Sequence, residues 1–143
     1  MPYATVPTIG AGSVLQFEDP DTPDTFIDLD DALNIGQVGE QSDQVEVTRI
    51  KSKTREYIAG LDTPPDKQLT FNHVPGNANY QLFLAQVDAR VNINMRVVYE
   101  SGDIADFNVA LLGRMMEEAE GNAQLKMSVF GKQSGRTEWS ESA

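Results

Sequence analysis

Apolar and polar side chains alternate along most of the chain, and a period of two residues is typical of half-buried β-strands. The first alternating stretch spans residues 13–17 and places Leu15 and Phe17 on one face. The second spans residues 27–35 and is interrupted by Asp31, so we expect a half-buried strand with a bend near that residue.

Further strands are expected where the same alternation returns, namely around Val45 and Val47, around Leu69 and Phe71, and over residues 91–99, 107–111 and 123–129. The stretch between the Val45 and Leu69 strands is polar and basic. Its length argues against a tight hairpin.

One segment has the periodicity of a helix instead. Between residues 77 and 87, apolar side chains recur at the i, i+3, i+4 and i+7 positions, and they are Tyr80, Phe83, Leu84 and Val87. Pro75–Gly76 breaks the chain before this segment, and Asn77 is a suitable N-cap. We therefore expect an amphipathic helix that packs against the sheet through the residue 91–97 strand.

The two ends of the chain carry weaker signals. Residues 1–12 contain two prolines and two glycines and are expected to form an extended arm, whereas residues 131–143 are polar and are expected to form a loosely ordered tail. The whole chain, residues 1–143, is expected to be a single domain. Its fold class is mainly β, a β-sandwich or open barrel of about seven strands with one flanking α-helix.

Composition narrows the range of functions. The chain has 143 residues, and its 11 Lys and Arg against 22 Asp and Glu give a formal net charge of −11. Such a surface repels nucleic acid and anionic lipid, which argues against sequence-specific DNA binding and membrane insertion. No stretch approaches the ~20 apolar residues of a membrane span, and the start of the chain lacks the pattern of a signal peptide. The absence of cysteine excludes a disulfide scaffold and thiol catalysis.

Candidate catalytic and metal-binding patterns are weak. An acidic cluster consists of Asp19, Asp21, Asp24, Asp28, Asp30 and Asp31. It lacks the glycine and the closing glutamate of a calcium loop, which favours a solvated turn. His73 is the only histidine and has no evident partner for a metal site or a catalytic dyad. We therefore expect no enzyme activity, no cofactor and no metal.

Four basic residues stand out in the polar stretch. Arg49, Lys51, Lys53 and Arg55 alternate, so all four would point to the same side of an extended ribbon. Without them the chain carries 7 basic and 22 acidic residues, a net charge of −15. A basic ribbon on an acidic body suggests self-association. A solvated loop and a DNA-contacting stripe remain alternatives.

The order of these features resembles the major tail tube proteins of long, non-contractile-tailed phages of the lambda type. The residues that carry the resemblance are 10–17, 26–29, the charged loop between the Val45 and Leu69 strands, Pro75–Gly76, 91–99, 107–114, and 125–129 followed by Gly131. The similarity covers nearly the whole chain. It lies in the order and patterning of the segments, because there is no invariant motif.

The resemblance implies a structural virion protein with the phage tail tube fold. Six subunits would form a ring, and rings would stack into a tube that serves as the conduit for DNA delivery into the host. The implied partners are other copies of the chain, tape-measure, tail terminator and distal tail proteins, and double-stranded DNA in transient passage without specific binding. The implied location is the virion tail, after assembly in the host cytoplasm.

Two sets of residues are candidates for tube contacts. The inter-ring set is Arg49, Lys51, Lys53 and Arg55, which would meet acidic groups of the neighbouring ring. The lumen-lining set consists of small polar or acidic residues on the faces opposite the core, namely Gln68, Thr70, Asn92, Asn94, Asp106 and Asn108. An alternative function is a small-molecule or glycan-binding β-domain, and a tube protein of a related secretion system is a further one.

Overall fold

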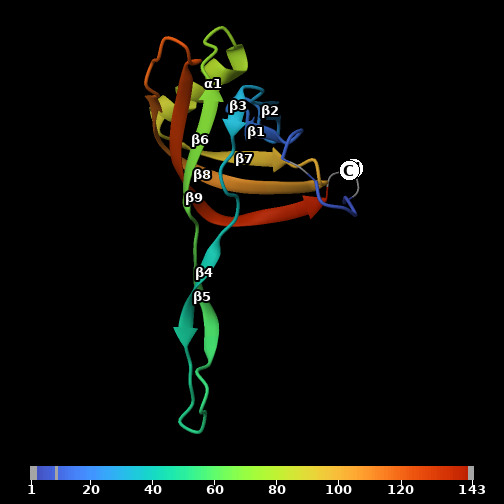
Figure 1. Cartoon of the computed structure of the whole chain (residues 1–143), viewed down its shortest axis with the longest axis vertical. Coiled ribbons are helices and arrows are strands. Elements are labelled where there is room, and N and C mark those ends of the chain that lie inside the picture. Colours follow the sequence, from blue (N-terminus) through green and yellow to red (C-terminus); the bar gives the residue numbers. More distant parts are fainter. Residues whose placement is uncertain (1–2, 9, 142–143) are drawn as a thin grey trace.

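The computed structural model describes residues 3–8 and 10–141 and shows a curled seven-stranded sheet, one helix and a long projecting hairpin (Figure 1). The strands are β1 (Val14–Glu18), β2 (Phe26–Asp28), β3 (Ala32–Asn34), β4 (Gln41–Glu46), β5 (Tyr57–Thr63), β6 (Asp66–Asn72), β7 (Asn92–Val98), β8 (Asp103–Met116) and β9 (Lys126–Glu141), and the helix is α1 (Ala78–Ala89). The seven-stranded sheet has the order β2-β1-β7-β8-β9-β6-β3, and β4 and β5 form a separate pair.

The large sheet curls back on itself because its two end strands are neighbours in the sequence. Only residues 29–31 join β2 to β3. At one side of this link, the Leu29 N–H donates to the Leu15 carbonyl oxygen on β1, at 2.8 Å. At the other side, the Asp31 carbonyl oxygen accepts from the Asn72 N–H on β6, at 2.9 Å. The expected fold of about seven strands is thus confirmed, as a single sheet that curls toward a barrel.

The helix closes the core. Asn77 caps α1 through its side-chain oxygen, as the sequence predicts, and Tyr80, Phe83, Leu84 and Val87 are buried. The Phe83 ring lies 5.4 Å from the Phe17 ring on β1 and 5.5 Å from the Phe71 ring on β6. The helix therefore packs across the inside of the curl. Ile93, Met95 and Val97 are also in the core, but Val91 is 38% exposed, so its expected core position is wrong.

Residues 27–35 do not form the single bent strand that their alternation predicts. They divide into β2 and β3, which pair with different strands, β1 and β6. The chain turns between them at Asp30 and Asp31, where it passes from one end of the sheet to the other. A hydrophobic period of two residues is the same on both sides of such a crossing, so the sequence pattern cannot reveal it.

The C-terminal segment is also not the loosely ordered tail that its polarity predicts. Residues 131–141 continue β9 and pair with β8 as far as Asp103↔Glu141. Gln133 and Thr137 are buried, so polar side chains occupy inward positions that usually hold apolar ones. A Cβ at Gly131 would lie 2.6 Å from the Cγ1 of Val109, so glycine permits this close approach of the two strands. Residues 142–143 lie outside the described part of the chain.

The N-terminal arm has no helix or strand in its described residues. Residues 3–8 are exposed, and residues 10–12 form a bend and a turn. The Ala4 N–H donates to the Ser101 carbonyl oxygen at 2.8 Å, which places the arm beside the β7–β8 turn. Residues 1, 2 and 9 of the expected arm lie outside the described ranges.

Candidate assembly surfaces

The hairpin formed by β4 and β5 extends away from the sheet along the long axis of the molecule (Figure 1). The sequence indicates one strand around Val45 and Val47 but not its partner β5. Val45 is paired directly with Ile58, and Val47 lies on the same face. Val45 is 44% exposed, Val47 41% and Ile58 56%, so the hairpin has an apolar face that the body of the chain does not cover.

The four alternating basic residues lie at the tip of this hairpin, where the structure corrects their expected geometry. Residues 49–55 are a loop between the strands, with a turn closed by the Ser52 N–H and the Arg49 carbonyl oxygen at 2.9 Å. A turn changes the direction in which successive side chains point, so the four basic side chains do not lie on one side of the hairpin as their alternation predicts. All four are exposed, as is Ile50.

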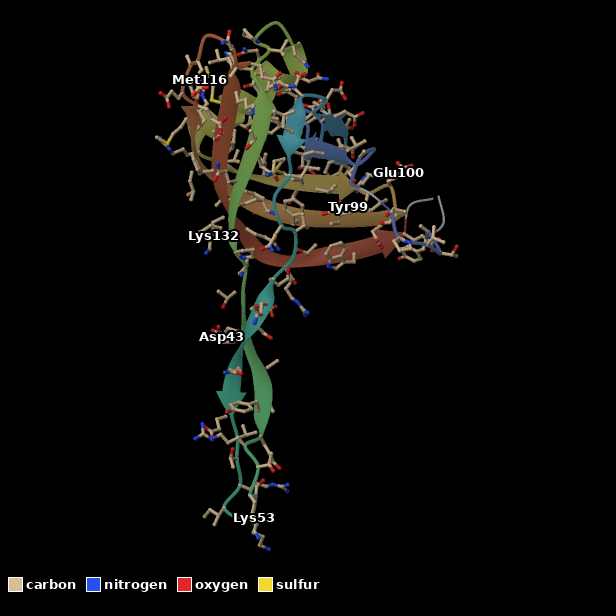
Figure 2. All side chains as sticks on the ribbon, viewed as in Figure 1. Asp43, Lys53, Tyr99, Glu100, Met116 and Lys132 are labelled. Atoms are coloured by element: carbon tan, nitrogen blue, oxygen red, sulfur yellow. The ribbon has the colours of Figure 1, made fainter. Side chains whose placement is uncertain are left out.

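One of the four cations is paired within its own chain. The Arg49 Nη2 lies 3.2 Å from the Glu56 Oε1. Lys51, Lys53 and Arg55 make no ion pair with any described residue. Figure 2 shows the Lys53 side chain at the far end of the hairpin. Three unpaired positive charges therefore remain available to a partner.

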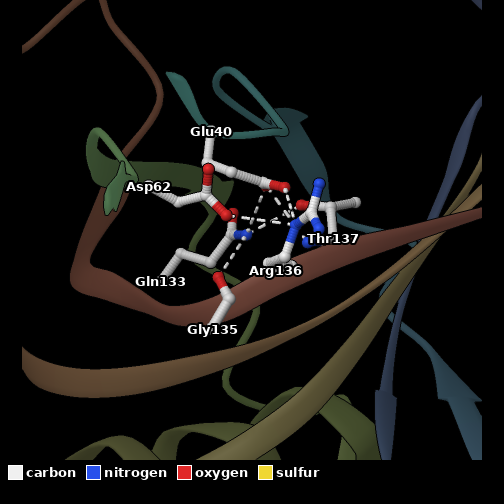
Figure 3. A network of polar contacts seen from close by, with 6 residues as sticks. All are labelled: Glu40, Asp62, Gln133, Gly135, Arg136 and Thr137. Atoms are coloured by element: carbon white, nitrogen blue, oxygen red, sulfur yellow. Dashed lines mark hydrogen bonds and ion pairs between the residues drawn. The ribbon is translucent and has the colours of Figure 1, made fainter. Parts of the chain in front are cut away.

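A polar network joins the base of the hairpin to β9 (Figure 3). The Glu40 Oε2 accepts from the Thr137 N–H at 3.1 Å and from the Gln133 Nε2 at 3.2 Å. Arg136 completes the network with its Nε 3.8 Å from the Glu40 Oε1 and 3.1 Å from the Asp62 Oδ2. Residues on both sides of the hairpin are thus held to one short segment of β9.

The charge of Glu40 is stabilised at this position. Burial alone would raise the pKa of the Glu40 carboxyl, because an ionised group loses hydration. The hydrogen bonds from Thr137 and Gln133 and the positive charge of Arg136 together outweigh burial, and the pKa lies below its usual value of 4.5. Glu40 is therefore ionised at neutral pH.

Lys67 holds the segment that leads into the hairpin. It is 3% exposed, and its Nζ donates to the Gln37 carbonyl oxygen at 2.5 Å and lies 4.6 Å from the centre of the Phe107 ring. Burial disfavours the charged form and lowers the pKa of the Lys67 ammonium group to about 8.

Three of the six lumen-lining candidates lie together on the outer face of β7 and β8. The Asn108 Nδ2 donates to the Asn94 Oδ1 at 3.0 Å, and the Asn94 Nδ2 donates to the Glu18 Oε2 at 3.4 Å. Asp106 lies on the same face, where its Oδ1 is 2.6 Å from the Arg96 Nε. These residues line one cavity of about 420 Å³.

The other three candidates do not line this cavity. Gln68 and Thr70 lie on the outer face of β6 and line a separate cavity of about 300 Å³. Asn92 is exposed at the start of β7, opposite Ala110. All six therefore lie away from the core, as the sequence predicts, but the structure divides them between two regions of the sheet.

The end of the molecule opposite the hairpin tip is acidic and partly apolar. Met115 and Met116 end β8 and are 66% and 44% exposed, and Leu125, just before β9, is 39% exposed. The connecting turn carries Glu117, Glu118 and Glu120 in four residues. A cavity of about 420 Å³ at this turn is lined by Glu117, Glu118, Glu120, Ala123, Gln124 and Lys126.

Tyr99, which is half-buried, and Trp139, which is exposed, form an aromatic pair. Their rings are stacked with centroids 6.4 Å apart, and together with Gly36–Gln41 they line a cavity of about 640 Å³. Trp139 is 55% exposed and belongs to β9, so its expected place in a loose tail is wrong.

Among residues 3–8 and 10–141, no group of three or more His, Asp or Glu side chains is arranged to hold a metal ion. Within the acidic cluster, Asp28 accepts from the Gln16 Nε2 and Asp31 accepts from the Asn77 Nδ2. His73 contacts the Tyr80 hydroxyl through its Nδ1 at 3.1 Å. No helix in these ranges is long and apolar enough to cross a membrane.

Sequence reasoning missed two parts of the assembly surfaces. It missed β5, although Tyr57 and Ile58 are strand-forming residues at the right distance to pair with Val45. It also missed the Glu40 network, because Glu40 and Thr137 are 97 residues apart. No local pattern predicts such a contact.

Residues 8–140 match a family model described as phage tail tube, TTP, lambda-like. The SPP1 tail tube is similar in structure, with 12% sequence identity and a TM-score of 0.74 over 94% of this chain and 80% of that one. The sheath–tube complex of an extracellular contractile injection system is similar at 8% identity and a TM-score of 0.73, over 96% of this chain and 93% of that one. The tail of an empty gene transfer agent particle is similar at 12% identity and a TM-score of 0.70, over 96% of this chain and 100% of that one. These likenesses establish a shared fold. No curated protein sequence matches the chain.

Proposed function

The chain belongs to the lambda-like phage tail tube family, and we propose that six copies of it close into a ring and that such rings stack into the tube of a virion tail. The protein is thus a tube-forming structural protein. The similar tail of the gene transfer agent has C6 symmetry, which supports a ring of six here.

The free-standing hairpin is the observation that carries the proposal. An isolated two-stranded hairpin is marginally stable in water, and this one leaves Val45, Val47 and Ile58 exposed. Its tip carries four basic residues on a chain of net charge −11. Stacking would cover the apolar face and bring the tip to acidic groups of the next ring. Arg49, Lys51, Lys53 and Arg55 are accordingly the proposed inter-ring residues, although Arg49 already has an internal partner.

The edges of the sheet support ring closure. Within the described residues, β2 pairs only with β1 and β3 pairs only with β6, so each has one unpaired edge. Exposed edges are sites at which another chain can add. A neighbouring subunit in the ring would remove them.

The lumen-lining set remains a proposal for the polar outer faces. Asn94, Asp106 and Asn108 provide neutral or acidic groups. Two cations line the same cavity, and both are paired, Arg96 with Asp106 and Arg136 with Asp62. Such a surface offers few charges that attract phosphate, so DNA could pass without specific binding. Gln68, Thr70 and Asn92 are proposed to line the same conduit.

Further partners follow from this assembly. A tube of defined length needs a tape-measure protein inside it, a terminator at one end and distal tail proteins at the other, and we place its assembly in the host cytoplasm. A tube-terminating cap is among the structures with the same fold, at 13% identity and a TM-score of 0.69.

Electron microscopy of the purified protein tests the proposal. Negative staining of concentrated protein should show tubes or rings, and class averages viewed down the axis should have six-fold symmetry. A monomer at every concentration, by microscopy and by sedimentation, would contradict the proposal. A variant lacking residues 49–55, closed by a short turn, should give single rings without long tubes.

A further inference from the structure

The two ends of the long axis of the molecule have opposite charge. The hairpin tip, residues 49–55, carries four positive charges and no negative one, whereas residues 117–120 carry three negative charges. Figure 2 shows Lys53 at one end of the long axis and Met116 near the other. Subunits stacked in the same direction would bring the tip of one copy toward the acidic end of the next.

Each end also exposes apolar side chains. Ile50 at the tip is fully exposed, and the opposite end exposes Met115, Met116 and Leu125. Methionine adapts its shape to a partner and is frequent at binding surfaces. An apolar centre with a charged rim is typical of a protein–protein contact.

We propose that the hairpin tip of one copy binds the Met115–Leu125 end of a copy in the next ring. Ile50 packs against Met116 and Leu125, and Lys51 and Lys53 face Glu118 and Glu120. This inference rests on the proposed function and adds the identity of the receiving surface. The contact joins two different surfaces, so it repeats along a stack without closing.

Half of the six aspartates in the other acidic cluster are already engaged within their own chain. Asp28 and Asp31 are bonded to Gln16 and Asn77, and the Asp19 Oδ1 accepts from the Asp21 N–H. Within the described residues, the side chains of Glu118 and Glu120 have no hydrogen bond or ion pair. Their charges are therefore fully available to Lys51 and Lys53.

Cysteine cross-linking tests the contact directly, because the chain has no cysteine of its own. In the double variant I50C/M116C the two thiols are at opposite ends of one copy, so a disulfide can join only different copies. Oxidised tubes of this variant should give a ladder of covalent multimers on a non-reducing gel. The single variants I50C and M116C should stop at dimers or monomers.

The matched control is I50C/D21C, which tests the other acidic cluster. A ladder from I50C/D21C but not from I50C/M116C would overturn the inference and leave the proposed function standing. Tubes of I50C/M116C without a ladder would overturn it as well. If the parent chain forms no tubes, the inference and the proposed function fail together.

A charge exchange gives a second measurement that needs no cysteine. K51E/K53E should lose tubes, and adding E118K/E120K to the same chain should restore them, because the attraction returns with its sign reversed. The control adds D19K/D21K instead, which gives the same net charge and should leave the loss unchanged. Restoration by D19K/D21K, or none by E118K/E120K, would overturn the inference.

Discussion

The Glu40 carboxylate accepts a hydrogen bond from the Thr137 N–H at 3.1 Å and thereby joins the start of the hairpin to the last third of the sheet's longest strand. Gln133 donates to the same oxygen, and Arg136 extends the contact to Asp62 on the other hairpin strand (Figure 3). Both strands of the hairpin are fixed at their base while the rest is free. The network therefore sets the direction in which the tip points.

Replacing Glu40 by alanine should loosen the hairpin. The change leaves the buried Thr137 N–H without its acceptor, whereas Gln133 keeps its bonds to Gly135 and to the Thr137 hydroxyl. Loss of the acceptor of one buried donor costs about 1–3 kcal/mol. We expect the free energy of unfolding to fall by this amount in urea titrations, and amide exchange in β4 and β5 to become faster. Glu46→Ala, on an exposed part of the same hairpin, is the control and should change stability by less than ~0.5 kcal/mol.

Acid should act through the same residue. The pKa of Glu40 is below its usual value of 4.5 in the folded chain, so its ionised form contributes stability that is complete above pH 4.5 and is lost as the pH falls through the folded pKa. Below pH 4.5 we expect the stability of the parent to fall toward that of Glu40→Gln. Parallel pH profiles for the two proteins would contradict this role.

Phe83 should be the most costly single truncation in the helix. Its ring is fully buried between Phe17 and Phe71, and truncation of a core aromatic residue costs about 3–5 kcal/mol. Urea unfolding of Phe83→Ala should show this loss, with Asn79→Ala on the exposed side of the helix close to the parent. A loss below ~1 kcal/mol would mean that the helix does not close the core.

Lys67 should make stability depend on pH in the alkaline range. Burial lowers the pKa of Lys67 to about 8 from the usual 10.5, so the unfolded chain holds this proton between these values while the folded chain has released it. The contribution of Lys67 to the free energy of unfolding therefore rises between pH 8 and pH 10.5. The parent should gain about 1–3 kcal/mol relative to Lys67→Met over this range.

The comparison with Lys67→Met removes the contribution of other groups. Burial raises the pKa values of Tyr80 and Tyr99, and their titration affects both proteins in the same way. Lys132→Met, at a half-exposed lysine, should follow the parent. Curves for Lys67→Met and the parent that stay parallel would show that Lys67 keeps its ordinary pKa.

Much of the fold could be predicted from the sequence because its signals are local. The period of 3.6 residues and the Asn77 cap predict α1, and the period of two predicts most of the strands. The division of residues 27–35 into β2 and β3 could not be predicted, since it depends on where the sheet closes. The end of β9 was mistaken for a tail because Gln133 and Thr137 are polar but buried.

The assembly surfaces were harder to predict. The spacing of Arg49, Lys51, Lys53 and Arg55 correctly indicated a basic projection, but the turn at residues 49–52 removes the shared side that the alternation implied. The apolar face of the hairpin depends on the pairing of Val45 with Ile58, and this register is visible only in the folded structure. Outward faces of strands follow from alternation, so the six lumen candidates lie away from the core as the sequence predicts, and their role in a lumen stays a proposal.

Fixed positive charges in the proposed lumen should slow DNA. Asn92 and Asn94 are exposed on the outer face of β7, so lysine fits at both positions without disturbing the core. Particles with Asn92→Lys and Asn94→Lys should assemble tubes but release DNA more slowly, because the cations would hold phosphates. Time-resolved ejection measures this, and unchanged kinetics would show that these residues face elsewhere. The same two residues replaced by glutamine provide a neutral control.

Electrostatic docking of the hairpin predicts a specific response to salt and to charge. The Lys51 and Lys53 charges lie at an exposed tip, so the K51E/K53E variant should fold normally by circular dichroism and fail to extend tubes. A single exposed pair contributes only ~0.2–1 kcal/mol, but the contact recurs around each ring and its small contributions accumulate through avidity.

Varying the salt concentration distinguishes the attraction between charges from the apolar contact at the hairpin tip. Surface charges are screened over about 8 Å at physiological ionic strength and over about 3 Å at 1 M, so tubes of the parent should shorten as salt rises. Ile50→Ser, with the cations intact, should weaken tubes at every salt concentration, because burial of apolar area does not depend on screening. If K51E/K53E forms tubes like the parent at low salt, charge does not drive docking. Stacking must then depend on apolar contacts, either of Ile50 at the tip or of Val45, Val47 and Ile58 on the same projecting hairpin.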